Sequence, residues 1–277
     1  MVKLKELLKG KLSENELALV PSSFDIVGDK IIFAGFPKEL AKKQKIVGQT
    51  LLEHFHTITS VFKKSKKHSG DFRIPKLTWI AGSKSKEVLY IEHGTRLKFD
   101  IEKVYFSPRL GNERKRIFLQ VKPKESVLCL FSGCGVYPLV ILKNTAAKEA
   151  LGIEINPLAH TYAVENVALN KIPKEKIALI NDDVRKVLPR IKKQFDRILM
   201  PLPKTSEQFL DIVLSKIMKN GIIHLYCFGS EEELKETIQR IIDECKKQKK
   251  KCSILSTTIC GHFSPRVFRW CIDFKVN

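Results

Sequence analysis

Residues 127–135 read VLCLFSGCG, an apolar run of strand character that ends in two closely spaced glycines. Glycines directly after a buried strand let a ligand approach the backbone, and the N-terminus of the helix that follows adds positive potential. A dinucleotide-binding fingerprint needs a third glycine at position 138, which is a proline here. The stretch therefore predicts a nucleotide-like cofactor behind a first parallel strand, and it argues against a nicotinamide cofactor.

The pattern continues to the C-terminus, with short β-rich apolar runs that mostly alternate with helical stretches. The runs lie at 127–130, 150–155, 177–180, 197–200, 221–226, 252–259 and 268–274. Such alternation predicts a mostly parallel sheet with helices on both faces. The last two runs are joined by GHFSP at 261–265, which is too short for a helix. We therefore expect an α/β domain with a seven-stranded sheet whose last strand is inverted, the layout of class I (Rossmann-like) methyltransferases.

The first hundred residues predict a smaller α+β module. A short lysine-rich helix around Leu4, Leu7 and Leu8 is followed by strands, a helix and an exposed basic connection. The strands are expected at 24–33 (two strands around a Gly28-Asp29 turn), 57–62, 77–81, 88–92 and 97–101, the helix at 37–55 and the connection at 63–68. The predicted organisation is a helical segment at 1–18, an α+β domain at 19–103, a linker at 104–117 and the large domain at 118–277.

The balance of charge favours a polyanionic partner. Lys and Arg number 50 against 30 Asp and Glu, which leaves a formal net charge of +20. Such a surface attracts nucleic acid through counterion release and long-range steering. A lysine-rich solvated surface of the kind that thermostable proteins carry is the alternative. Charge alone does not choose between the two.

The cysteines and the apolar segments indicate a reducing, non-membrane environment. The seven cysteines form no C-x-x-C pair, so we expect free thiols, no disulfide framework and no metal site. The N-terminus lacks the apolar stretch of a secretory signal, and no run approaches the ~18 apolar residues needed to cross a bilayer. We expect a cytoplasmic monomer.

Acidic residues follow the second and third predicted strands. Glu154 ends the second strand, where it is placed to accept hydrogen bonds from both ribose hydroxyls of a cofactor. Asp182 or Asp183 follows the third strand and could accept from an adenine amino group. A single acid in such a place is usually a helix cap. Three elements in the correct order favour S-adenosylmethionine as the cofactor.

Residues 105–114 read YFSPRLGNER. This segment resembles the hallmark of the archaeal and eukaryotic tRNA (guanine-37-N1)-methyltransferases, which stands just before their catalytic domain. Further matches to that family, which is related to the wybutosine-synthesis aminocarboxypropyl transferases, lie at 23–29, 69–73, 92–94, 155–157, 195–203 and 224–226. The resemblance implies an enzyme that uses S-adenosylmethionine to methylate guanine 37 in the anticodon stem-loop of tRNA.

The resemblance also assigns roles to residues. Glu113 stands where the family's general base removes the N1 proton of guanine, and Arg73 stands where an arginine stabilises the charge that builds on O6. Arg109 would contact the cofactor or guide the base, while Tyr105 and Arg114 would contact anticodon-loop nucleotides. The plain alternative is a helical salt bridge between Glu113 and Arg109, four residues apart. The expected cofactor contacts are Arg109, Phe131, Gly133, Gly135, Glu154, Ile155, Asp182, Asp183, Pro201 and Pro203.

The sequence departs from the family pattern in three places. Pro201 replaces an asparagine that helps to place the guanine, and proline has no donor. Cys129 replaces an aspartate of the first strand that helps to order the amino-acid end of the cofactor. The N-terminal domain with which many members grip the tRNA elbow is absent or reduced to residues 1–18, so recognition would depend on the anticodon stem-loop.

Three other functions stay open. A wybutosine-pathway aminocarboxypropyl transferase shares the architecture, but its typical F-S-x-G-N segment does not match Phe106-Ser107-Pro108-Arg109-Leu110. A methyltransferase that acts on a carbon of a wyosine precursor at the same nucleotide is favoured by the loss of the asparagine at Pro201. A non-catalytic RNA-binding paralogue is favoured by Cys129 and Pro201, and Glu113 and Arg73 argue against it.

Overall fold

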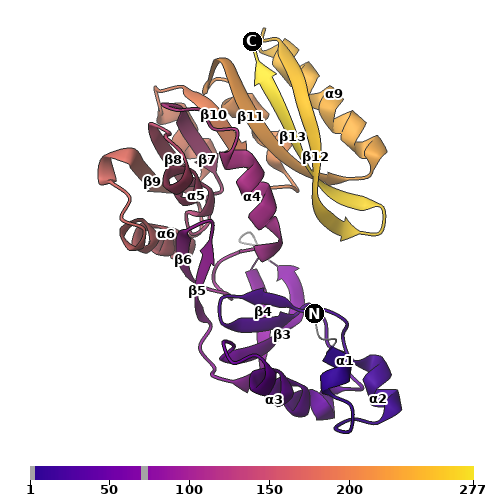
Figure 1. Cartoon of the computed structure of the whole chain (residues 1–277). Coiled ribbons are helices and arrows are strands. Elements are labelled where there is room, and N and C mark those ends of the chain that lie inside the picture. Colours follow the sequence, from indigo (N-terminus) through magenta and orange to yellow (C-terminus); the bar gives the residue numbers. More distant parts are fainter. Residues whose placement is uncertain (1–3, 70–73) are drawn as a thin grey trace. The chain divides into compact units, whose positions relative to one another are not determined.

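The computed structural model describes residues 4–69 and 74–277. The chain divides into two compact units. The first contains Met1–Ile91 and Arg96–Pro108, and the second contains Glu92–Thr95 and Arg109–Asn277. Figure 1 colours the chain along its sequence, from the indigo first unit to the yellow C-terminal strand. No helix among the described residues is long and apolar enough to cross a membrane.

The second unit is built on a seven-stranded sheet in the order β12-β13-β11-β10-β7-β8-β9. Neighbouring strands from β11 through β9 pair in parallel, β13 runs antiparallel to β11, and β12 runs antiparallel to β13. The bounds are β7 Ser126–Leu130, β8 Glu149–Glu154, β9 Ile177–Asn181, β10 Phe195–Met200, β11 Ile217–Gly229, β12 Cys252–Ser264 and β13 Val267–Val276. The predicted seven strands, the terminal hairpin and the inverted last strand are confirmed.

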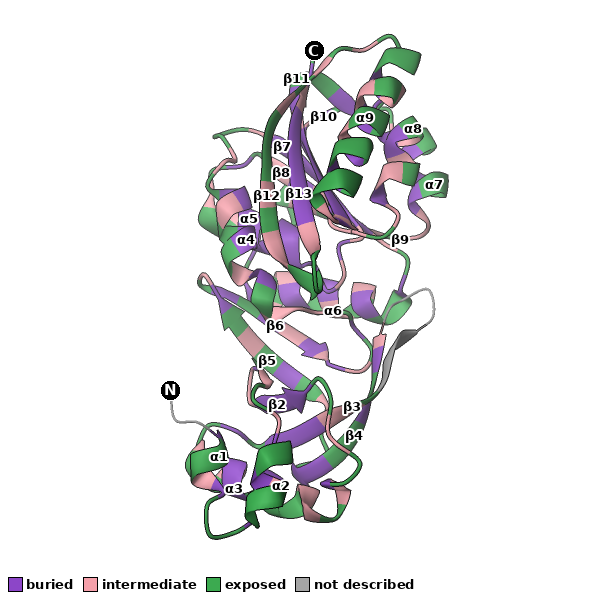
Figure 2. Ribbon diagram, turned by 90° about the vertical axis from the view of Figure 1, so that its right-hand side faces the viewer, coloured by how far each residue is buried: buried purple, intermediate pink, exposed green. Residues whose placement is uncertain are grey.

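Helices cover both faces of this sheet, as Figure 2 shows. One face carries α4 (Gly111–Phe118), α5 (Val136–Asn144) and α6 (Pro157–Leu169), and the other carries α7 (Val184–Val187), α8 (Leu210–Val213) and α9 (Glu231–Lys247). Short 3-10 turns lie at Pro108–Leu110, Lys174–Lys176, Leu188–Arg190 and Ser206–Phe209. The amphipathic α9 begins with a capping box between Ser230 and Glu233 and buries Leu234 and Ile241 at helical spacing.

Helix α4 begins within the segment 104–117, which the sequence predicts to be a linker, and ends at Phe118. It belongs to the second unit, because Glu113, Arg114, Ile117 and Phe118 are buried along it. The reason is the side-chain network described below, which joins α4 to β11 and β13 of the same unit.

The described residues of the first unit form three α-helices, a four-stranded sheet, β1-β2-β3-β4, and most of a hairpin of β5 and β6, whose turn at Glu92–Thr95 belongs to the second unit. The bounds are α1 Leu4–Leu7, α2 Glu14–Leu19, β1 Asp25–Val27, β2 Lys30–Phe33, a 3-10 turn at Ala41–Lys43, α3 Gln44–His54, β3 Ser60–Ser69, β4 Ile74–Gly82, β5 Glu87–Glu92 and β6 Thr95–Asp100. Gly28 takes a φ of 58° in the β1–β2 turn, a conformation that glycine adopts without strain. Leucines of α1 and α2 share one core with β2, β3 and α3.

The prediction that residues 63–68 form a connection is wrong, because strand β3 continues through them. The parallel pairing with β2 ends at Phe33 and Lys63, whereas the antiparallel pairing with β4 runs on to Ser69 and Ile74. The extension is therefore a two-stranded ribbon. Backbone pairing in such a ribbon does not require the apolar side chains by which a buried strand is recognised in sequence.

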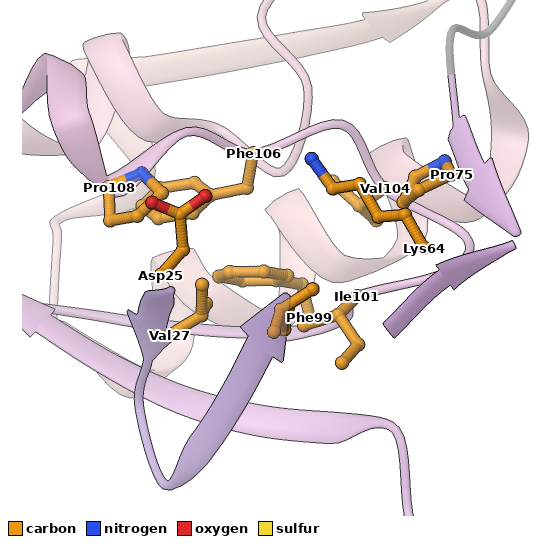
Figure 3. A pocket seen from close by; sticks show the side chains of 10 residues that line it. Asp25, Val27, Lys64, Pro75, Phe99, Ile101, Val104, Phe106 and Pro108 are labelled. Atoms are coloured by element: carbon orange, nitrogen blue, oxygen red, sulfur yellow. The ribbon is translucent and has the colours of Figure 1, made fainter. Parts of the chain in front are cut away.

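A small cavity of about 40 Å³ lies inside the first unit. Its lining is Asp25, Val27, Ile32, Lys64, Pro75, Phe99, Ile101, Val104, Phe106 and Pro108. The rings of Phe99 and Phe106 pack against each other at 4.7 Å between centroids, and the polar ends of Asp25 and Lys64 stand apart (Figure 3). The space accommodates a few water molecules and is too small for a nucleobase.

Candidate active site

The glycine stretch forms a tight turn between β7 and α5. Phe131, Gly133 and Gly135 take positive φ angles of 53°, 57° and 81°. Gly135 caps the N-terminus of α5, and a Cβ there would lie only 3.1 Å from Leu139 Cδ1 and 3.3 Å from Ala163 Cβ. Glycine is therefore required at position 135, both for its backbone conformation and for its lack of a side chain.

Glu154 locks this turn from the neighbouring strand. Its Oε2 accepts a hydrogen bond from the Gly133 amide at 2.7 Å, and its Oε1 accepts one from the Asn156 amide at 2.8 Å. Burial raises the pKa of the carboxyl above its ordinary value, while these backbone donors act in the opposite direction. Each carboxylate oxygen has a second lone pair, so Glu154 can hold the turn and still accept from ribose hydroxyls.

The third strand places its acidic pair differently from the prediction for Asp183. One oxygen of Asp183 caps α7 by accepting from the Arg185 amide at 2.8 Å, which is the helix-cap role that the sequence left open. Asp182 accepts from the Asp183 amide at 2.7 Å. Ile155, which follows Glu154, is 49% exposed. Asp182 and Ile155 thus stand at the carboxyl ends of adjacent parallel strands.

The segment after β10 completes this edge of the sheet. Pro201 and Pro203 are partly exposed, and the Pro203 carbonyl accepts from the Phe228 amide at 3.0 Å. Phe131 packs edge-on against Phe209 with 5.0 Å between ring centroids. Since β8, β7 and β10 are parallel neighbours, Glu154, the glycine turn and Pro201 lie along one edge. Ligands of open α/β sheets bind at such an edge.

Cys129 lies within β7, between Gly152 of β8 and Leu199 of β10 in register. It is fully buried, and burial raises the pKa of its thiol far above the ordinary range. The side chain is therefore an inert, neutral part of the core. It offers no charge to a cofactor.

Glu113, the predicted general base, is buried, with a side chain 4% exposed. Its Oε1 accepts from the Tyr226 hydroxyl at 2.7 Å and from Arg116 Nη2 at 2.8 Å, and its Oε2 accepts from Arg116 Nε at 2.7 Å. The salt bridge on the helix is thus made with Arg116, three residues on, and not with Arg109. The sequence reasoning missed both partners.

A chain of charged groups continues from Arg116 through the sheet. Arg116 Nη1 donates to Asp273 Oδ2 at 2.6 Å, and Asp273 Oδ1 lies 2.7 Å from His224 Nδ1. On the other side, Arg197 Nη1 lies 2.6 Å from His224 Nε2, and Arg197 Nε donates to Glu125 at 2.7 Å. Arginine can only donate, so Nε2 of His224 accepts and Nδ1 carries the proton. His224 is therefore neutral, and burial lowers its pKa.

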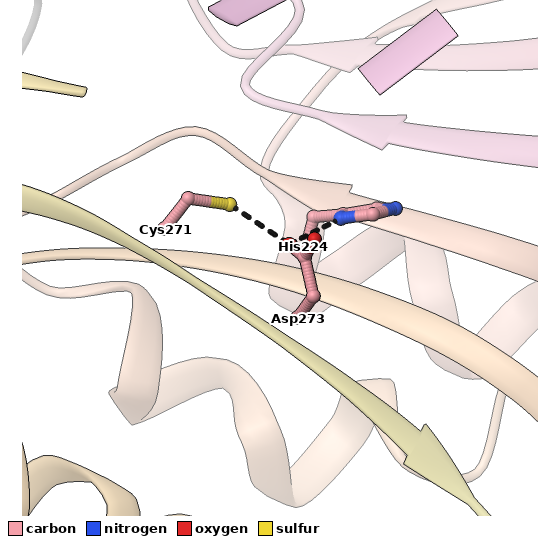
Figure 4. Close-up of side chains that lie close together, drawn as sticks. All are labelled: His224, Cys271 and Asp273. Carbon is pink, nitrogen blue, oxygen red and sulfur yellow. Dashed lines mark hydrogen bonds and ion pairs between the residues drawn. The ribbon is translucent and has the colours of Figure 1, made fainter. Parts of the chain in front are cut away.

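His224, Cys271 and Asp273 offer three potential metal ligands, with atoms within 4.8 Å of one another (Figure 4). Both nitrogens of His224 are already hydrogen-bonded, and the Cys271 thiol donates to Asp273 at 3.2 Å. The guanidinium groups of Arg116 and Arg197 stand beside the same groups. Two adjacent cations disfavour a third, so the cluster has the character of a hydrogen-bonded network and not of a metal centre.

Arg114 does not have the surface position that an RNA contact requires. Its side chain is 3% exposed and forms a two-point ion pair with Glu92, with Nη2 donating to Oε2 at 2.6 Å and Nε donating to Oε1. Next to Glu92, His93 Nε2 lies 2.9 Å from the Gly111 carbonyl. The turn between β5 and β6 is thereby fastened to the start of α4 inside the second unit.

Two further predicted contacts, Tyr105 and Arg109, have exposed side chains. Tyr105 is 36% exposed in the first unit, and Arg109 is exposed in the second. Arg73 lies outside the described residues, so its predicted place near O6 stays a prediction.

A polar signal for the missed residues exists in the sequence. His224 and Tyr226 share one face of a buried strand, and Arg197 and Asp273 interrupt apolar runs.

Comparison with known proteins agrees with this architecture. The model of the TRM5/TYW2 methyltransferase domain matches residues 88–255, and that of the TYW2 N-terminal domain matches residues 4–85. The chain belongs to the TRM5/TYW2 methyltransferase family. Residues 1–18, which the sequence analysis set apart, thus lie largely within the match to a TYW2-type N-terminal domain.

Two curated relatives in the TRM5/TYW2 family carry names that specify a reaction. The tRNA (guanine(37)-N(1))-methyltransferase Trm5b of Pyrococcus abyssi is 35% identical over 93% of this chain and 76% of its own length. The tRNA (guanine(37)-N(1))/4-demethylwyosine(37)-methyltransferase Taw22 of Nanoarchaeum equitans is 30% identical over 80% of this chain and 89% of its own. The crystal structure of the Pyrococcus abyssi Trm5b superposes with a TM-score of 0.86, at 35% identity, over 96% of this chain and 78% of that one.

Proposed function

We propose that this chain is an S-adenosylmethionine-dependent tRNA methyltransferase that forms N1-methylguanosine at position 37. The observation that carries the proposal is the enclosed Glu113 carboxylate, which stands within the matched methyltransferase domain and retains capacity to accept a proton. The relatives named above as guanine-37 methyltransferases support the same reaction.

The edge formed by the glycine turn and Glu154 suits the cofactor. A Cβ at Gly135 would press against Leu139 and Ala163, so glycine suits this turn, and Glu154 keeps acceptor sites beside it. Bound S-adenosylmethionine would supply an electrophilic methyl group. The residues proposed to hold it are Arg109, Phe131, Gly133, Gly135, Glu154, Ile155, Asp182, Pro201 and Pro203, with Asp183 acting mainly as the cap of α7.

The reaction requires the chain to remove a proton from guanine N1, a weak acid at neutral pH. Glu113 can act as the general base, because the described residues occupy three of its roughly four lone-pair sites and leave one on Oε2. Charge that develops on O6 would be stabilised by Arg73, as the sequence resemblance implies. The net charge of +20 and Tyr105 would support binding of the anticodon stem-loop by a cytoplasmic monomer.

The test is product analysis. The chain is incubated with labelled cofactor and with tRNA that carries guanosine at position 37, and the nucleosides are separated by chromatography against an N1-methylguanosine standard and identified by mass. We expect N1-methylguanosine from this tRNA and none from a tRNA with adenosine 37. An aminocarboxypropyl addition, or the absence of any modified nucleoside, would overturn the proposal.

A second methyl acceptor is favoured by two observations. Pro201 removes the side-chain donor that would place a guanine, and the Nanoarchaeum equitans relative is named for both guanine 37 and 4-demethylwyosine. Transfer to 4-demethylwyosine at the same nucleotide is therefore the alternative. Methylation of tRNA containing that base, together with no reaction on guanosine 37, would select it.

A further inference from the structure

One tyrosine hydroxyl and one guanidinium hold the Glu113 carboxylate inside the second unit, and a second tyrosine hydroxyl bonds the first. A carboxylate can only accept, so the Tyr226 hydroxyl donates its proton to Glu113. The Tyr226 oxygen lies 2.8 Å from the Tyr137 hydroxyl, which must then donate to it. The order of donation is thus determined from Tyr137 through Tyr226 to Glu113.

Both tyrosines stay neutral donors. Tyr137 and Tyr226 are 5% and 1% exposed, and burial raises the pKa of both hydroxyls above their ordinary value. The hydroxyl of Tyr226 reaches Glu113 from β11, which pairs with β13 and β10 in the centre of the sheet. The donor therefore stands on an interior strand of the sheet.

Arg116 is also held on the side that faces away from Glu113, by Asp273. Its guanidinium binds Glu113 through Nε and Nη2 and binds Asp273 through Nη1. Asp273 accepts further hydrogen bonds from His224, from Gln120 at 3.2 Å and from Ser256 at 3.1 Å. Burial alone would raise the pKa of the Asp273 carboxyl. The hydrogen bonds from His224 and Arg116 outweigh this effect and hold the pKa far below its usual range. Arg116 therefore faces two anions at fixed places.

We propose that Tyr226 and Arg116 are positioning residues that orient the Glu113 carboxylate, leaving one lone pair of Oε2 for the proton of the substrate. The inference rests on the proposed function. It assigns roles to groups that never touch the substrate: Tyr226 fixes Oε1, Arg116 fixes the plane of the carboxylate, and Asp273 fixes Arg116. Tyr137 acts one step further away, by orienting the Tyr226 hydroxyl.

The experiment is a double-mutant cycle on the single-turnover rate at saturating tRNA and cofactor. Tyr226→Phe keeps the ring and removes the hydroxyl, and we expect the rate to fall about 10- to 100-fold, as for a lost hydrogen bond to a charged group. The KM values for tRNA and cofactor should change less than about twofold, because binding contacts are intact. In a Glu113→Gln background the same substitution should cause no further loss.

Matched variants separate positioning from general packing. Thr161→Val removes an exposed hydroxyl on α6 that donates to the Pro157 carbonyl at 3.0 Å, outside the Glu113 network, and should leave the rate unchanged. Tyr137→Phe should lower the rate less than Tyr226→Phe does. Arg116→Lys should restore part of the rate that Arg116→Met loses. If Tyr226→Phe prevents folding, the cycle is run with Arg116→Lys, for which the same non-additivity is expected.

The outcomes are distinguishable. Additive losses in the cycle, or a Tyr226→Phe rate equal to that of the wild-type chain, would overturn the positioning roles while the proposed function stands. A wild-type chain that methylates no nucleoside of tRNA overturns the proposed function, and the inference falls with it.

Discussion

Glu154 accepts the Gly133 amide proton at 2.7 Å, which couples the end of β8 to the turn that follows β7. The bond joins two residues that are 21 positions apart in the sequence. Gly133 has a left-handed backbone conformation and Glu154 ends strand β8, and a ligand can approach both places. The bond makes Glu154 a structural part of the turn as well as a candidate ribose ligand. The two roles can be separated experimentally.

Glu154→Gln should weaken cofactor binding about tenfold or more. The NH2 group of the glutamine would stand where the carboxylate now accepts from the amides of Gly133 and Asn156, so that two donors would face each other. We expect the effect in calorimetric titration with S-adenosylmethionine, with little change in the far-UV spectrum. Glu149→Gln on the same strand is the control, since Glu149 bonds Ser126 at 3.0 Å and the Lys193 amine instead. Equal affinity of both variants would remove Glu154 from the cofactor site.

Replacing Arg114 with alanine should lower the free energy of unfolding by about 3–5 kcal/mol, because it leaves the Glu92 carboxylate buried without its partner. Urea-induced unfolding measures the change. Glu236→Ala, which removes an exposed pair with Arg240 at 3.7 Å, should cost less than about 1 kcal/mol. A small stability loss for Arg114→Ala combined with weaker tRNA binding would instead support the RNA contact that the sequence suggested.

Stability should decline as the pH falls below about 6.5, the ordinary pKa of histidine. The pKa of His224 is lowered in the folded state, mainly by burial, so the unfolded chain binds a proton that the folded chain resists. Asp273, whose folded pKa is also lowered, adds stability that is lost only at much lower pH. The free energy of unfolding between pH 7 and 5 should therefore fall less in His224→Gln than in the wild-type chain. Parallel slopes would contradict the neutral state of His224.

Neutralising the lysines at the end of α9 should flatten the dependence of tRNA affinity on salt, if this tract touches RNA. Each lost phosphate contact lowers the slope of log affinity against log salt by about 0.7 to 0.9. The residues to replace by glutamine are Lys246, Lys247, Lys249, Lys250 and Lys251. An unchanged slope would make the tract a solvated helix end.

The sequence predicts the large domain well because its signals are local. Apolar runs of strand length, a glycine turn and an inverted final hairpin identify all seven strands. Helix α2 was not predicted, although Ser13 and Glu16 give a local signal for it, because they form a capping box with bonds of 3.3 and 2.9 Å. The extension of β3 through residues 63–69 was not predicted either, because backbone pairing in a two-stranded ribbon leaves no apolar periodicity in the sequence.

The side chains that surround Glu113 could not be predicted from local sequence signals in the same way. Its partners lie 3 and 113 residues away, and Asp273 lies 157 residues beyond Arg116. The register of β11 with β13 places His224 directly opposite Asp273, and no local pattern specifies that register. The resemblance identified a carboxylate, whereas the fold determines which donors surround it.

The chain of charges from Glu113 to Glu125 has an evolutionary consequence. Removing any one member leaves a neighbour with an uncompensated charge or an unmet hydrogen bond in the interior of the sheet. Substitutions at Arg116, His224, Asp273 and Arg197 should therefore be inherited together. Lineages that diverge from this pattern are expected to replace the whole set by an alternative packing and not to pass through single exchanges.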